Sequence, residues 1–171
     1  LKSDHYQASI KGIEASELPL IPHPKGEVYS KNPDMLLKEA VSKTAFAVSF
    51  DETRPILTGV LLRFKDNNLK IVSTDSYRLA EKTIPLGEKV KENKDLVVPV
   101  KTLIEISRII SGTDEKVSMT IGENQVLFAL NDSQIVSRLI EGAFPDYESI
   151  IPSKLKTKAI REGIPYKTLA S

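Results

Sequence analysis

The chain contains no cysteine, only two histidines and only eight glycines among its 171 residues. The absence of cysteine excludes disulfides and thiolate ligands for a metal, and it fits a reducing, cytoplasmic location. No apolar stretch approaches the roughly 20 residues that cross a bilayer, so we expect no membrane partner. The glycines are scattered at predicted turns and form no phosphate-binding loop.

The chain also lacks an excess of charge of either sign. Lysine and arginine total 24 and aspartate and glutamate total 23, which leaves a formal net charge of +1. Attraction to nucleic acid would therefore have to come from local clusters of cations rather than from total charge. Hydrophobic residues make up 40% of the chain, which is enough for one globular core at this length.

Residues suited to catalysis are scarce. His5 and His23 lie in an N-terminal region interrupted by prolines, where a lone histidine is more often exposed than functional. Asp51, Glu52 and Asp75 could bind Mg²⁺ through carboxylate oxygens. Asp75 follows a predicted strand, however, and hydrogen bonds to nearby turn amides explain it better. We therefore expect no catalysis, no metal and no cofactor, and keep a metal-dependent enzyme acting on nucleic acid as an alternative.

The hydrophobic periodicity predicts an α+β domain. Asn32-Pro33-Asp34 is typical of a helix start, and apolar residues at helical spacing follow it, which predicts a helix over 33–46. A second helix is expected over 99–110, ended by Gly112. Alternation with a period of two predicts strands over 56–64, 69–73, 77–84, 95–98, 116–121, 125–130 and 133–139. Because the connections are short, we expect an antiparallel sheet with both helices on one side.

The two predicted helices carry basic residues on their polar faces. If both apolar stripes pack on the sheet, these cations share one surface that offers several charges to phosphates with little sequence specificity. The residues are Lys38, Lys43, Lys101 and Arg108. Glu39 and Glu105 lie on the same helices, so an ordinary solvated helix surface is the alternative interpretation.

A second candidate site is an apolar cleft with a polar rim. It requires Leu57, expected in a strand beside the 74–79 loop, to converge with three other apolar residues: Leu79, Pro145 and Ile150. Polar groups of Thr74, Tyr77 and Arg78 would then orient a peptide whose apolar anchors fill the cleft. Simple core packing is the alternative for Leu57 and Leu79.

Four motifs occur in a fixed order over about 120 residues. They are Arg54-Pro55-Ile56-Leu57-Thr58-Gly59-Val60, Ser73-Thr74-Asp75-Ser76-Tyr77-Arg78-Leu79-Ala80, Val97-Val98-Pro99 and Glu141-Gly142-Ala143-Phe144-Pro145-Asp146-Tyr147. Together they resemble the middle domain of a bacterial DNA sliding clamp, the β subunit of DNA polymerase III. The resemblance implies a DNA clamp fold, with two helices packed on antiparallel β-sheets. It divides the chain into the end of a first clamp domain with its linker (1–24), a middle clamp domain (25–152), and a tail or the start of a truncated third domain (153–171).

The resemblance also implies a function. Sliding clamps are non-catalytic processivity factors, in which two three-domain chains form a ring around double-stranded DNA. Their partners are the DNA polymerase III catalytic subunit, the clamp loader and other proteins that carry clamp-binding peptides. The present chain would be a partial clamp, and a stand-alone peptide-binding module or decoy without a ring is the alternative.

The family's functional residues can be placed on this sequence. The wall that the second domain contributes to the peptide cleft carries over to Leu57, Thr74, Tyr77, Arg78, Leu79, Pro145 and Ile150. Many relatives have histidine where this chain has Tyr77, so the aromatic rim is kept but its hydrogen bonding changes. For DNA, Lys101 matches a basic position that faces the bore, and Arg54 lies in a loop that can approach DNA.

Overall fold

The computed structural model describes residues 2–3, 6–9, 11–17, 24, 28–111, 116–130 and 132–152. The N-terminal part contains two short antiparallel strands and a 3₁₀ turn, namely β1 (Lys2–Ser3), β2 (Tyr6–Gln7) and η1 (Ala15–Glu17). His5, His23, Gly112 and residues 153–171, all of which figure in the sequence predictions, lie outside the described residues. Within the described part, no helix is long and apolar enough to cross a membrane.

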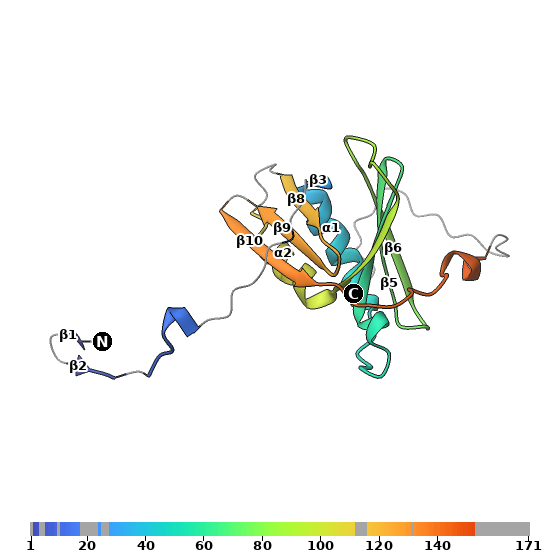
Figure 1. Cartoon of the computed structure of the whole chain (residues 1–171). Coiled ribbons are helices and arrows are strands. Elements are labelled where there is room, and N and C mark those ends of the chain that lie inside the picture. The colour runs from blue at the N-terminus through green and yellow to red at the C-terminus, as the bar shows by residue number, and fades with distance from the viewer. Residues whose placement is uncertain are drawn as a thin grey trace, which may run out of the picture.

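The main body is built from two antiparallel four-stranded sheets (Figure 1). Sheet 1 has the strand order β10-β9-β8-β3, and sheet 2 has the order β6-β5-β4-β7. The strands of sheet 1 are β3 (Ser30–Pro33), β8 (Lys116–Ile121), β9 (Gln125–Leu130) and β10 (Ser133–Arg138). Those of sheet 2 are β4 (Gly59–Lys65), β5 (Asn68–Thr74), β6 (Leu79–Pro85) and β7 (Lys94–Pro99). The prediction of an antiparallel α+β fold is confirmed, but the single sheet expected from the sequence is in fact two.

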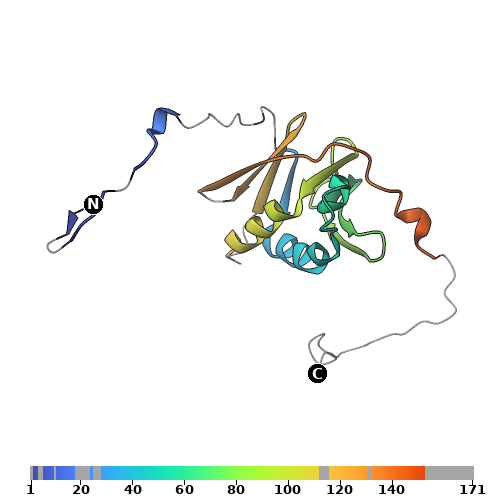
Figure 2. The same ribbon diagram turned by 90° about the horizontal axis from the view of Figure 1, so that it is seen from below.

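Two helices, α1 (Asp34–Thr44) and α2 (Val100–Ile109), lie side by side against the two sheets (Figure 2). Helix α1 contacts β3, β5 and β6, whereas α2 contacts β7 and β10, so each helix bridges both sheets. The two helices contact each other directly, as expected for helices that lie on one side of the strands.

One continuous core lies between the helices and the sheets. Leu37 of α1 and Leu103 of α2 are fully buried there, together with Leu62 and Phe64 of β4. Along β4 the next residues, Leu61 and Arg63, point to the opposite face, as the period of two in a strand requires. Burying each large apolar side chain of the core, such as Leu62 or Phe64, contributes about 1.5–3 kcal/mol to the stability of the fold. The face of sheet 2 that packs on the helices therefore supplies much of the stability of the domain.

The two sheets are joined where the chain leaves β10. The Ile140 amide donates a hydrogen bond to the Val97 carbonyl of β7 at 2.8 Å. Gly59 lies at this junction, and a Cβ atom there would stand 2.6 Å from Val97 Cγ1 and 2.7 Å from Ile140 Cδ1. The glycine is therefore required by the close approach of the two sheets, which accounts for its place in the first sequence motif.

Two local predictions are wrong, those for Asn32 and Leu57, whereas the first helix lies within two residues of its predicted bounds. Asn32 does not cap a helix, because it is buried in β3, a strand that the sequence did not predict, and its Nδ2 donates to Ser30 Oγ at 3.1 Å. Helix α1 begins at Asp34 and ends at Thr44, and a 3₁₀ turn, η2 (Ala45–Ala47), follows it. Leu57 lies in another 3₁₀ turn, η3 (Pro55–Thr58), rather than in the strand predicted over 56–64. The proline at the start of η3 suits the first position of a helical turn and accounts for the shift.

Candidate functional site

The turn between β5 and β6 holds the second sequence motif in a fixed shape. Oδ1 of Asp75 accepts hydrogen bonds from the amides of Tyr77 at 2.9 Å and Arg78 at 2.7 Å. Oγ1 of Thr74 donates to the Arg78 carbonyl at 2.7 Å and closes the turn from the other side. Ser76 has a left-handed backbone with φ of 78°, which few residues other than glycine adopt readily. The structure therefore confirms that Asp75 serves the turn.

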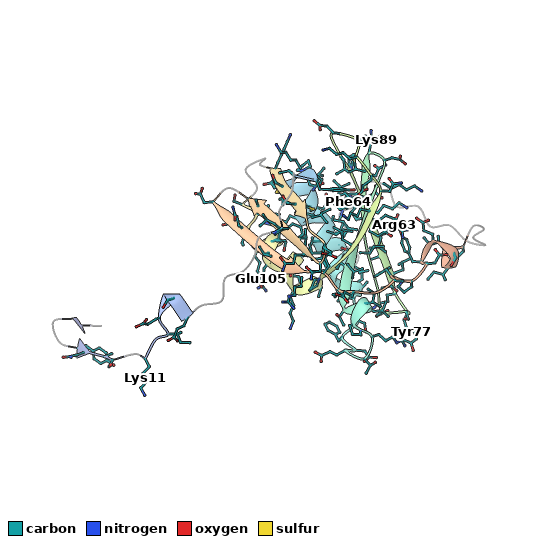
Figure 3. The ribbon with its side chains drawn as sticks, in the orientation of Figure 1. Lys11, Arg63, Phe64, Tyr77, Lys89 and Glu105 are labelled. Atoms are coloured by element: carbon teal, nitrogen blue, oxygen red, sulfur yellow. The ribbon has the colours of Figure 1, made fainter. Side chains whose placement is uncertain are left out.

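The turn presents Tyr77 to solvent. The side chain is 95% exposed, and Figure 3 shows it projecting from one end of sheet 2. Arg78 is also exposed, and its guanidinium forms an ion pair with Asp75 Oδ2 at 2.8 Å. The same guanidinium lies 6.0 Å from the centre of the exposed Phe46 ring. The turn thus presents an aromatic hydroxyl and a cation beside the aromatic face of Phe46 from η2, as a polar rim for a ligand requires.

A pH titration tests the role of Asp75. Backbone hydrogen bonds from Arg78 and Tyr77 lower the pKa of its carboxyl to about 2. A carboxyl whose pKa is lowered by folding stabilises the fold above its unfolded value of about 3.9, and this stability is lost as the pH falls towards 2. We expect the amide shifts of Tyr77 and Arg78 to titrate together near pH 2, followed by NMR, and Asp75→Asn to abolish the titration. A midpoint near pH 4 would contradict this assignment.

The 49–58 loop packs beside this turn. Nη1 of Arg54 donates to Ser76 Oγ at 3.1 Å and connects the first motif with the second. Asp51 Oδ1 accepts hydrogen bonds from the amide and hydroxyl of Thr53, and these bonds lower the pKa of the Asp51 carboxyl. The carboxylates of Asp51 and Asp75 therefore each accept hydrogen bonds within their own turns. In the described part of the chain, no group of three or more potential metal ligands occurs.

The fourth motif lies on the face of sheet 2 that points away from the helices. Tyr147 is 1% exposed and packs with Leu61, Val72 and Val97, while Leu79 and Phe144 lie against the same cluster. The Arg63 guanidinium stands over the Tyr147 ring at 5.4 Å from its centre. The tyrosine-arginine-leucine turn and the phenylalanine-proline segment therefore meet in one apolar cluster through Leu79 and Phe144. Gly142, with φ of 126°, allows the chain to turn onto this face.

Charged side chains on the outer surface of sheet 2 hold the 144–150 segment in place. Lys70 Nζ lies 3.2 Å from Glu148 Oε1, and Arg63 Nη1 lies 3.4 Å from the same oxygen. Arg63 also forms a two-pronged pair with Asp95, with its Nη2 at 2.8 Å from Oδ2. These residues were not singled out in the sequence, because they come from three separate strands and a turn and share no local motif.

The predicted cleft residues differ in exposure. Leu57 is only 3% exposed, so its side chain offers little free surface on this chain. Thr74 is buried and Leu79 is half-buried against the Tyr147 cluster. Ile150, in the 3₁₀ turn η4 (Glu148–Ile150), is 65% exposed, and Pro145 is also exposed. Exposed apolar groups of this kind are surface that a second protein segment can cover.

Two of the four cations predicted on the helices have a carboxylate partner. Lys43 pairs with Glu39, and Arg108 pairs with Glu105 at 2.5 Å. Lys38 Nζ donates to the Ile110 carbonyl at 2.8 Å, just beyond the end of α2. Lys101 is exposed and forms no ion pair with any residue that the structure describes. The helix surface therefore carries a weaker positive field than its lysine count indicates.

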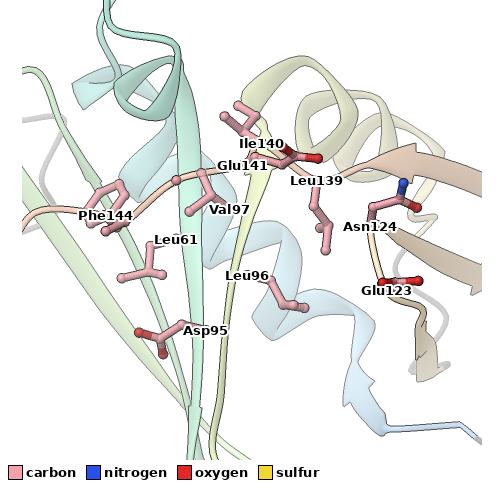
Figure 4. Close-up of a pocket in the computed structure, with 12 residues that line it drawn as sticks. Leu61, Asp95, Leu96, Val97, Glu123, Asn124, Leu139, Ile140, Glu141 and Phe144 are labelled. Atoms are coloured by element: carbon pink, nitrogen blue, oxygen red, sulfur yellow. The ribbon is translucent and has the colours of Figure 1, made fainter.

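A groove of about 690 Å³ lies between the two sheets (Figure 4). Its apolar floor includes Leu61, Val97 and Phe144, and its rim carries the carboxylates of Asp95 and Glu141. Sequence reasoning missed this groove because its lining comes from four separate parts of the chain. The only local signal was the apolar pair Leu139-Ile140 just after β10.

These features define a clamp-type α+β domain. Two adjacent helices pack against two four-stranded antiparallel sheets, and the exposed turn lies at one end. Residues 32–146 match the family of the DNA polymerase III beta subunit, central domain. The chain belongs to this family.

Relatives of known sequence and structure agree with this assignment. The chain is 36% identical to a beta sliding clamp of Staphylococcus epidermidis over 158 residues, which is 92% of this chain and 42% of that protein. A beta sliding clamp of Staphylococcus aureus is 35% identical over the same shares. The sliding clamp of Bacillus subtilis superposes with a TM-score of 0.79 and 38% identity, over 83% of this chain and 37% of that one. The DNA polymerase beta subunit of Streptococcus pyogenes gives a TM-score of 0.78 and 31% identity, over 85% and 39%. The chain thus spans about 42% of the length of the curated relatives it matches.

Proposed function

We propose that the chain is part of a sliding clamp that encircles double-stranded DNA and tethers a replicative DNA polymerase. The observation that carries the proposal is the shared apolar cluster, which joins the Tyr77-Arg78-Leu79 turn to the Phe144 segment. Family membership supplies the context, because relatives of this chain are beta sliding clamps. In this proposal residues 1–24 end a first clamp domain, 25–152 form the middle domain, and 153–171 lead towards a third.

In the proposed mechanism the protein acts by topology rather than by chemistry. A closed ring stays on DNA without tight contacts, so a weak cation field is better suited to sliding than strong phosphate pairing. The helix surface, where Lys43 and Arg108 pair with carboxylates, fits this requirement, with Lys101 and Arg54 as the DNA-facing cations. Lys38 and Lys43 were also expected to contact DNA; in this proposal they serve mainly to stabilise the helix layer. The chain would carry no catalytic group, and it would act in the cytoplasm.

Partner proteins would bind at the rigid turn. The proposed wall consists of Leu57, Thr74, Tyr77, Arg78, Leu79, Pro145 and Ile150, completed by a neighbouring domain. The polymerase catalytic subunit, the clamp loader and other partners would each insert a short peptide with apolar anchors. Exchange between partners calls for affinities near the micromolar range, which correspond to about −8 kcal/mol.

A peptide-binding measurement tests the proposal. The test uses a full-length clamp subunit that carries this sequence. Arg78→Ala combined with Leu79→Ala is expected to lower its affinity for a clamp-binding peptide about tenfold, which corresponds to about 1.4 kcal/mol of binding free energy. The reason is that one substitution removes a rim cation and the other removes an apolar side chain that lies in the same cluster as Phe144. Calorimetry gives the affinity, and Arg138→Ala, an exposed arginine on β10, is the matched control. Unchanged affinity in a folded double variant would refute the assignment of the cleft.

A further inference from the structure

A second cavity lies at the end of sheet 2 opposite the Tyr77 turn. Its volume is about 510 Å³, and it is lined by residues from the start of β3, the β6–β7 connection and the start of β8. Figure 3 shows Lys89 of this region and Tyr77 at opposite ends of the molecule. Among the lining residues that the structure describes, four are lysines, namely Lys31, Lys89, Lys91 and Lys116, and one, Glu88, is a carboxylate. We call it the lysine pocket.

Two lysines of the lysine pocket have no ion-pair partner among the residues that the structure describes. Lys31 and Lys116 are exposed and form no ion pair with any described residue. Lys89 Nζ lies 3.8 Å from Asp66 Oδ1, but both side chains are largely exposed, and such a pair neutralises little charge. On the helices, Lys43 and Arg108 each have a carboxylate partner on the same helix, in pairs that are also exposed.

The walls of the lysine pocket are fixed by the fold. The Tyr29 hydroxyl donates to the Glu92 carbonyl, and the Tyr29 ring meets Phe64 edge-on at 5.2 Å between ring centres. The β6–β7 connection is held by two backbone hydrogen bonds, from Leu86 to Asn67 at 2.7 Å and from Val90 to Asp66 at 3.1 Å. The lysines therefore extend from an ordered frame, which lowers the entropic cost when an anion binds.

The geometry points to the lysine pocket as a binding site for the phosphate backbone of duplex DNA. Lysine ammonium groups act as point charges and suit phosphate contacts that can be made and broken without a fixed orientation. Single-stranded DNA fits the pocket less well, because its unpaired bases stack on exposed aromatic rings and the Tyr29 ring already packs on Phe64. An apolar peptide is also disfavoured, since Leu86 and Val90 are buried and Val28 is the exposed apolar residue of the lining.

The position of the pocket connects it with the helix surface. Strand β3, which carries Lys31, ends at Pro33, and α1 begins at the next residue. Pro33 pairs in register with Lys116 of β8, so two of the four lysines lie beside the start of the helix layer. A duplex that passes along the helices would reach these lysines at one rim. The inference rests on the proposed function and adds to it a place where the protein holds the duplex.

A titration of the 171-residue chain tests the inference. A 20-base-pair duplex is added at low salt, and the amide signals of the protein are followed by NMR. We expect the largest shifts at Lys31, Lys89 and Lys116, with smaller ones at Lys101. The double variant Lys31→Gln/Lys116→Gln should weaken binding and reduce the slope of log affinity against log salt by about 2, or about 1 for each phosphate that is no longer neutralised. Lys11→Gln, which removes an exposed lysine far along the chain, should leave affinity and slope nearly unchanged.

Three results would overturn the inference. The first is a set of shifts confined to α2, and the second is a salt slope that the double variant leaves unchanged. The third is a poly-glutamate peptide of equal charge that shifts the pocket signals when the duplex does not, because the occupant would then be an acidic protein segment. Peptide binding at the Tyr77 turn is measured separately, so the lysine pocket can fail while the proposed clamp function stands.

Discussion

Replacing Tyr147 by alanine is expected to lower the free energy of unfolding by about 3–5 kcal/mol. The side chain is 1% exposed, fills the cluster of Leu61, Val72 and Val97, and lies under the Arg63 guanidinium. Its removal leaves a cavity and also takes away the anchor that holds residues 141–151 on sheet 2. Urea denaturation measures the change in stability. In a full-length clamp subunit, peptide affinity should fall as well, because Pro145 and Ile150 are then no longer fixed in position.

The matched control is Tyr147→Phe. The Tyr147 hydroxyl is buried, and none of its contacts with described residues has the geometry of a hydrogen bond. Burial, with the nearby Glu81 carboxylate as the second cause, raises the pKa of this phenol well above its ordinary value. Removing an unsatisfied hydroxyl while keeping the ring should leave stability unchanged or raise it by up to about 1 kcal/mol. A large fall in the stability of Tyr147→Phe would show that the hydroxyl, rather than the ring, anchors the segment.

Replacing Phe64 by alanine should have an effect of similar size, about 3–5 kcal/mol. Phe64 is fully buried in β4 and packs on the helix side of sheet 2, where it also meets the edge of Tyr29. Small domains have total stabilities of roughly 5–15 kcal/mol, so this single change removes a large part of the total. Thermal and urea unfolding of the same chain measure the difference.

Phe64→Leu is the conservative comparison for this position. It keeps an apolar side chain in the core and should cost less than about half as much as alanine. Because Phe64 supports the Tyr29 ring beneath the lysine pocket, the alanine variant should also broaden the amide signals of Tyr29 and Lys31. A Phe64→Ala protein as stable as the parent would mean that the core is not centred on β4.

The strands and helices were predictable where side-chain periodicity is strong. Apolar residues at every second position, namely Val60, Leu62 and Phe64, identify β4 from the sequence, whereas the burial of Leu61 on the opposite face depends on the rest of the fold. The helix stripe of Leu103 and Ile106 likewise identifies α2, and both helices lie within a few residues of their predicted bounds. What the local pattern could not show is β3, because its four residues include a proline and a buried asparagine. Pairing with β8, about 85 residues away, makes this segment a strand.

The candidate site was partly predictable for a similar reason. The role of Asp75 follows from local turn chemistry, which sequence carries directly. The burial of Leu57 and the use of Lys38 to bind the Ile110 carbonyl depend on tertiary contacts that no periodicity contains. The lysine pocket was missed because its cations lie in three separate segments, and only the fold brings them to one cavity.

The hydrogen bond from Ile140 to Val97 gives the domain a mechanical property. It fastens the chain leaving sheet 1 to the edge strand of sheet 2, a few residues before Tyr147 enters its cluster. Tension that enters through β3 in one sheet and leaves through Tyr147 on the other must therefore load both sheets at once. Neither sheet can peel open alone, so stretching this domain should produce one abrupt rupture rather than a stepwise extension.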